Sequence, residues 1–119
     1  MLHLLHRQRY QEFQQALEQL HKRVTAKDLQ GAALLDNVRE VQQLFQNQIA
    51  SLSAEDCAPE DASRWQSIQT EIYKQMRLLQ ADVMRLQASR SSATSVSRTA
   101  DLSDRINTLI QYCQALLQL

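Results

Sequence analysis

The residues of this chain that are able to do chemistry are few and scattered. His3 and His6 stand three residues apart, so on a helix they share a face, as two ligands of one metal ion would. The segment around them supplies no acidic or cysteine partner, so we expect no metal site there. Cys57 and Cys113 have no C-x-x-C partner, and we expect two free thiols in a reducing compartment.

Signatures of enzymes are also missing from the sequence. A single glycine excludes the glycine-rich loops that hold phosphates and dinucleotides, and no Ser-His-Asp signature of a hydrolase is present. We therefore expect no catalytic, cofactor-binding or metal-binding residues, no small-molecule substrate, and a protein that is not an enzyme.

Composition favours a helical domain. The chain has 119 residues, enough for one domain spanning 1–119, and its single glycine and single proline favour long helices over a β-rich fold. Thirteen basic residues balance thirteen acidic ones, so no overall charge attracts nucleic acid or an anionic membrane. No apolar run is long enough to span a membrane. The apolar run at the start is too short for a signal peptide, and the charged residue follows it, so we expect a cytoplasmic protein.

The rest of the chain is organised around a long predicted helix over about 59–90. Pro59 suits its first position, and apolar residues then recur at spacings of three and four, which puts them on one stripe. The serine-rich segment 89–97 that follows predicts a polar turn, with a frayed helical extension as the alternative. The stripe consists of Trp65, Ile68, Ile72, Met76, Leu79, Val83 and Leu86.

Three shorter helices are predicted over about 2–26, 29–52 and 99–119, each with a matching apolar stripe. Asp28 suits the N-cap of the second, and Asp101 and Arg105 form an i,i+4 pair in the last. Short connections between four such helices predict an all-α, antiparallel four-helix bundle with one long third helix. Its predicted core contains Phe13, Phe45, Trp65, Ile72, Val83 and Ile106.

A surface for a partner protein is predicted on the outer face of the third helix. Leu78 falls some 120° from the centre of the stripe, counting about 100° per residue, and charged residues surround it. A leucine framed by charges is typical of a small protein-binding patch, although a single exposed leucine is also ordinary. Leu4 poses the same question on the first helix. The candidate partner-binding residues are Glu71, Lys74, Leu78, Asp82 and Arg85.

Five segments of helical sequence resemble the cyanobacterial heterocyst frequency control protein family, PatD. The resemblance extends from about Tyr10 to Leu117 and includes no catalytic motif. The segments are QQLFQ (42–46), ASRWQSIQTEI (62–72), RLLQADVM (77–84), SDRI (103–106) and YCQA (112–115).

The resemblance implies a non-enzymatic developmental regulator that binds the tubulin-like division protein FtsZ and modulates the assembly of its filaments. It would thereby influence division and heterocyst differentiation, in the cytoplasm or at the division site, and a homodimer is one way to supply two contact surfaces. Two alternatives stay open: a structural scaffold that oligomerises through leftover apolar surface, and a nucleic-acid-associated regulator. The second is disfavoured because the basic residues of the third helix spread around it without interleaved aromatics.

Overall fold

The computed structural model describes residues 4–26, 31–53 and 58–119, and within these ranges the protein is all-helical, as predicted. Asp28, His3 and Cys57 lie outside the described residues. The helices begin and end within a few residues of the predicted positions except at the start of the fourth. They are α1 (Leu4–Thr25), α2 (Gly31–Gln48), α3 (Pro59–Gln87) and α4 (Ser92–Leu117).

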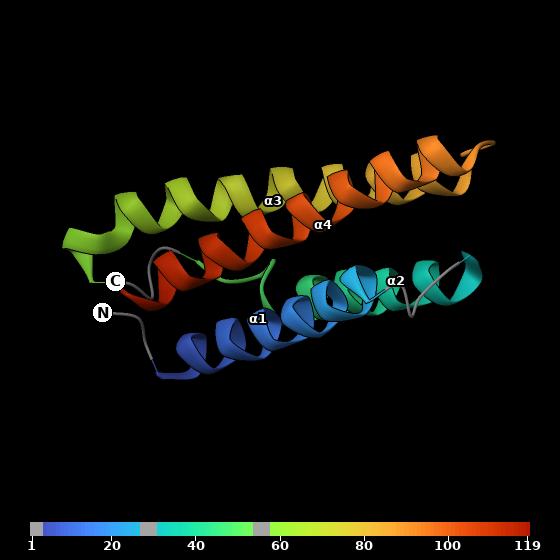
Figure 1. Ribbon diagram of the computed structural model, residues 1–119. Coiled ribbons are helices and arrows are strands. Elements are labelled where there is room, and N and C mark those ends of the chain that lie inside the picture. Colours follow the sequence, from blue (N-terminus) through green and yellow to red (C-terminus); the bar gives the residue numbers. More distant parts are fainter. Residues whose placement is uncertain (1–3, 27–30, 54–57) are drawn as a thin grey trace.

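The helices lie lengthwise against one another in a body of 50 × 20 × 19 Å (Figure 1). The fourth helix packs along both α1 and α3, whereas α2 touches α1 and, least of all, α3. With 29 residues α3 is the longest helix, and at about 1.5 Å per residue it reaches nearly the full length of the body. The second helix has only 18 residues, so it covers part of that length.

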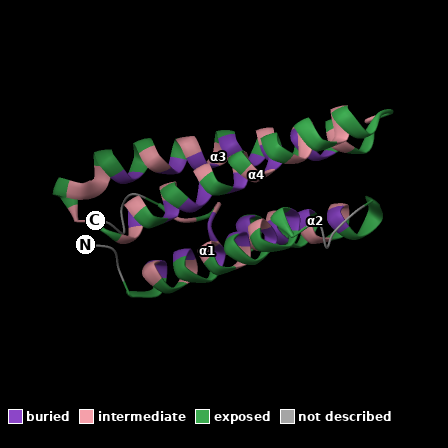
Figure 2. Ribbon diagram, viewed as in Figure 1, coloured by how far each residue is buried: buried purple, intermediate pink, exposed green. Residues whose placement is uncertain are grey.

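The core consists of the apolar stripes of all four helices (Figure 2). All six residues predicted for the core are buried, which confirms that part of the prediction. The stripe of α1 is buried over its whole predicted length, from His6 to Val24. On α3 the stripe is buried except at Ile68 and Leu86, which are half-buried. The largest fully buried side chains include Tyr10, Phe13, Leu17, Leu20, Ile49, Ile72, Leu79, Leu102, Ile106, Leu109 and Leu116.

The connection between α3 and α4 is shorter than predicted. The serine-rich segment 89–97 is not a turn throughout, because α4 begins at Ser92 instead of near Thr99. Ser91 has extended backbone dihedral angles, and its hydroxyl oxygen accepts a hydrogen bond from the backbone N–H of Thr94 at 3.1 Å. A serine in that role stabilises a helix start, so the serines beyond it continue the helix and do not interrupt it.

The carboxyl end of α2 is held by side chains from two other helices. Helix ends leave backbone carbonyls without partners inside the helix. Here the carbonyl of Gln48 accepts from Arg9 of α1 at 3.4 Å, and the next one, of Ile49, accepts from Gln69 of α3 at 3.2 Å. The hydroxyl of Tyr73 donates to the carbonyl of Ala50. The helix ends at Gln48, earlier than the predicted Leu52, and these remote donors satisfy carbonyls at and just beyond its end.

Replacing Trp65 by alanine tests the core. Trp65 is 3 % exposed, and truncating a buried tryptophan removes both its burial and its packing, so we expect the free energy of unfolding to fall by about 3–5 kcal/mol. Met84→Ala, at an exposed position of the same helix, should change it by no more than about 0.5 kcal/mol. Equal denaturant midpoints for the two variants would contradict the burial of Trp65.

Candidate functional site

The predicted partner-binding residues do not share one solvent-exposed face. Lys74 and Arg85 are exposed, Glu71 and Leu78 are half-buried, and Asp82 is buried at 4 % exposure. The outward placement of Asp82 is therefore wrong. Because α3 packs on α4 along its flank as well as through its apolar stripe, its buried arc is wider than the stripe alone indicates. Partner binding by these residues stays a prediction.

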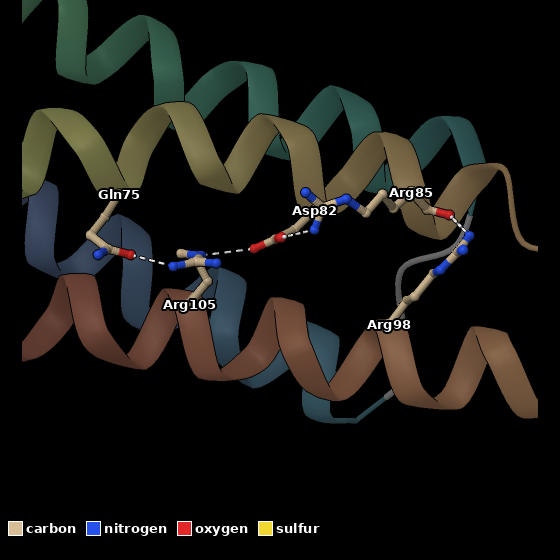
Figure 3. A network of polar contacts seen from close by, with 5 residues as sticks. All are labelled: Gln75, Asp82, Arg85, Arg98 and Arg105. Carbon is tan, nitrogen blue, oxygen red and sulfur yellow. Dashed lines mark hydrogen bonds and ion pairs between the residues drawn. The ribbon is translucent and has the colours of Figure 1, made fainter.

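Asp82 instead belongs to a network of polar contacts between α3 and α4 (Figure 3). Its Oδ2 accepts a hydrogen bond from Nε of Arg105 at 2.9 Å, and its Oδ1 lies 3.4 Å from Nη1 of Arg85. Arg105 also donates through Nη1 to the amide oxygen of Gln75 at 2.7 Å. A buried carboxylate needs such partners, so the network fixes how α3 and α4 lie relative to each other.

Three members of the network in Figure 3, Gln75, Arg98 and Arg105, are not among the predicted site residues. The sequence pairs Arg105 with Asp101 on its own helix, but its salt bridge within the described residues runs to Asp82, 23 positions away. A signal was present: Gln75 and Asp82 are seven residues apart, so they occupy one face of α3 two turns apart. The spacing predicts that the two side chains share a face of α3. It does not predict which helix packs against that face.

A second feature is an uncharged groove of about 760 Å³ between the start of α2 and the α3–α4 connection. Its lining includes small residues, such as Gly31 and Ala32, and the side chain of Val96, which is 61 % exposed. Gly31 has a φ of 57°, a conformation that glycine adopts without strain. The groove is lined by Val24, Gly31, Ala32, Leu34, Leu35, Leu86, Gln87, Ser92, Ser95, Val96 and Thr99.

The histidines and carboxylates of the described residues do not assemble into a metal site. Glu18 and His21 have the i,i+3 spacing of helix-borne metal ligands, yet His21 Nε2 lies 3.1 Å from the hydroxyl of Ser103 and Glu18 accepts from Gln14. No group of three potential ligands occurs among the residues that the structure describes. None of the described helices combines the length and apolar character needed to cross a membrane.

Cys113 is a fully buried thiol on the stripe of α4. Burial, together with the negative charge of Glu18, raises its pKa from 9.0 to about 12. The thiolate is the reactive form of cysteine, so this side chain behaves as a small core residue.

Breaking the ion pair of Asp82 tests its role. In Arg105→Leu the carboxylate of Asp82 stays buried and keeps only the longer contact with Arg85. We expect the free energy of unfolding to fall by about 2–3 kcal/mol. This is less than for a fully buried ion pair, because Arg105 is partly exposed. The double variant Asp82→Leu/Arg105→Leu should recover most of that loss, because no unpaired charge remains. A double variant that is less stable than the single one would contradict this account.

Labelling with iodoacetamide tests the burial of Cys113 in a Cys57→Ser background. We expect no labelling of the native protein at pH 8 and complete labelling in denaturant. Since the folded pKa lies above the unfolded one, the stabilisation from the neutral thiol is complete below about pH 9 and is lost as the pH rises toward 12. Rapid labelling of the folded protein at pH 8 would contradict the burial.

Comparisons with known proteins leave the family open. No family model, no curated protein and no solved structure matches this chain. The likeness to the PatD family therefore stays a prediction from five segments of helical sequence. What the structure itself supplies is the uncharged groove and, between α3 and α4, a polar network in which Gln75 and Asp82 are buried.

Proposed function

We propose that the chain is an antiparallel four-helix bundle that works as a non-enzymatic protein-interaction module. Its partner in this proposal is FtsZ, whose assembly it modulates in the cytoplasm at the division site, with effects on division and heterocyst differentiation. The partner is supported by the sequence resemblance to the PatD family. The mode of action is supported by the shape of the surface.

The observation that carries the proposal is the uncharged groove. Its volume of about 760 Å³ falls in the range of ligand-binding sites. Its walls are formed by the ends of α1 and α3 and by the starts of α2 and α4. Apolar grooves of this kind bind the apolar face of an amphipathic helix, whose side chains at i, i+3 and i+4 enter the groove. The exposed side chain of Val96 offers an apolar contact at its edge.

Modulating a filament by bridging requires two contact surfaces per particle. The groove lies at one end of the molecule, and the exposed side chains of Lys74 and Arg85 lie on a different face of α3. A monomer with these two surfaces is able to contact two subunits, and a homodimer doubles either surface. Both arrangements are compatible with a body 50 Å long.

A structural oligomerisation scaffold is the second candidate. The same groove supports it, because an uncharged concave surface is able to bury apolar residues of another copy of the chain. The two candidates differ in what Val96 contacts: FtsZ in the first, and another copy of this chain in the second.

The test is the variant Val96→Glu. A charge placed in an apolar contact should weaken co-sedimentation with cyanobacterial FtsZ at least about tenfold, or about 1.4 kcal/mol. Folding should be unaffected, since Val96 is exposed and near the start of α4, where a negative charge is favourable.

Met84→Glu is the matched control, because Met84 is also 61 % exposed and lies outside the groove. We expect it to sediment with FtsZ like the wild type. Equal curves for wild type and both variants would overturn the groove as the contact with FtsZ. If Val96→Glu changes only the mass of the free protein measured by light scattering, the scaffold function takes its place.

A further inference from the structure

Three arginines lie where α3 and α4 run side by side, two of them in contact with the carboxylate of Asp82 and the third with the backbone of Arg85 (Figure 3). We call Arg85, Arg98 and Arg105 the arginine cluster. Arg105 and Arg85 flank Asp82 at 2.9 and 3.4 Å, and Nη1 of Arg98 donates to the backbone carbonyl of Arg85 and, at 3.3 Å, to the hydroxyl of Ser89. The cluster therefore brings together residues from two helices.

The charges of the arginine cluster do not balance. Asp82 carries one negative charge and uses one oxygen for each of two guanidinium groups. Arg98 has no carboxylate partner among the described residues, and its acceptors there are uncharged. With Asp101, which is exposed one turn along α4 from Arg98, three positive charges face two negative ones, which leaves an excess of one positive charge on this surface.

Some guanidinium N–H groups of the arginine cluster have no acidic partner among the described residues. The side chain of Arg85 is 62 % exposed, and its contact with Asp82 is longer than a charge-assisted hydrogen bond normally is. The hydrogen bonds of Arg98 within the described residues involve only one of its three guanidinium nitrogens. A guanidinium group presents its N–H groups as a fork that matches the two oxygens of a carboxylate.

A purely structural role accounts for part of this arrangement. Arg98 contacts a carbonyl in the last turn of α3, where a positive charge is favourable, and such a contact helps to end the helix. That role uses one nitrogen of Arg98 and none of the exposed donors of Arg85. The excess charge therefore needs a further explanation.

Nucleic acid fits this surface less well than an acidic protein segment. The chain as a whole has no net charge, so it offers no broad positive field to a continuous phosphate backbone. A short acidic segment needs only a few carboxylates at the cluster itself. Forked pairing with carboxylates also provides the specificity and the fast association that charged surfaces give.

We propose that the arginine cluster binds an acidic, carboxylate-rich segment of a partner protein, with Arg85 and Arg98 contacting its carboxylates and Arg105 holding Asp82 beneath them. This inference deepens the proposed function, on which it rests for the partner. It concerns a different surface from the groove, so the two are separable by experiment. Arg105 is a positioning residue, because its own contacts are with Asp82 and Gln75.

The test uses a fluorescent hexaglutamate peptide, and fluorescence anisotropy measures its binding to the full chain at low salt. Arg85→Gln/Arg98→Gln should weaken binding at least about fivefold, since the two guanidinium groups proposed to contact the carboxylates are lost. Arg64→Gln/Arg77→Gln is the matched control: it removes the same charge from exposed positions elsewhere on α3 and should change binding less than about twofold. Equal losses in the two double variants would overturn the proposal.

Two further measurements keep the outcome clear. If Arg85→Gln/Arg98→Gln melts at a lower temperature than the wild type, Arg85→Gln is compared with Arg77→Gln, because both side chains are exposed. A twelve-residue oligothymidylate that binds more tightly than hexaglutamate, and depends on the same two arginines, would overturn the acidic protein segment in favour of nucleic acid. A wild-type chain that co-sediments with FtsZ but does not bind hexaglutamate would refute this inference alone. A wild-type chain that binds hexaglutamate through Arg85 and Arg98 but does not co-sediment with FtsZ would refute only the FtsZ function.

Discussion

Burial of the apolar stripe of α4 is the constraint on which the other helices depend. Its stripe residues, from Leu102 to Leu116, are buried because α1 covers one side and α3 the other. With both flanks of α4 occupied, α2 is left to pack mainly on α1. The short α2 then covers only part of the length of α1 and α3, and its first residues line the uncharged groove.

The groove and the arginine cluster differ in what holds them in place. The groove lies where helices begin and end. Small residues at the start of α2 and the first turns of α4, which begins at Ser92, line it. The arginine cluster follows from a buried charge, since Asp82 must be compensated and thereby draws Arg105 and Arg85 to one place. One surface offers apolar contact and the other charge, which are the two means by which proteins usually bind each other.

The core was predictable from the sequence because spacings of three and four residues identify the buried side of each helix without knowledge of its neighbours. The same reasoning failed for Asp82, because its partner Arg105 lies on another helix. The rotation of one helix relative to another is not predictable from the sequence of either helix alone. The start of α4 was missed because a serine-rich segment is compatible with both a turn and a capped helix start. The contact of Arg98 with α3 was not predictable from the sequence, because it depends on the length of the connection between α3 and α4.

The three carbonyls at the carboxyl end of α2 make that helix unequal at its two ends. Arg9, Gln69 and Tyr73 tie its last turn to α1 and α3, whereas the bond between Gln87 and the carbonyl of Gly31 at its start is exposed to solvent. Local opening costs least where hydrogen bonds are exposed and packing is sparse. Local opening of α2 therefore costs least at Gly31, and because Gly31 lines the groove, opening there would widen the groove.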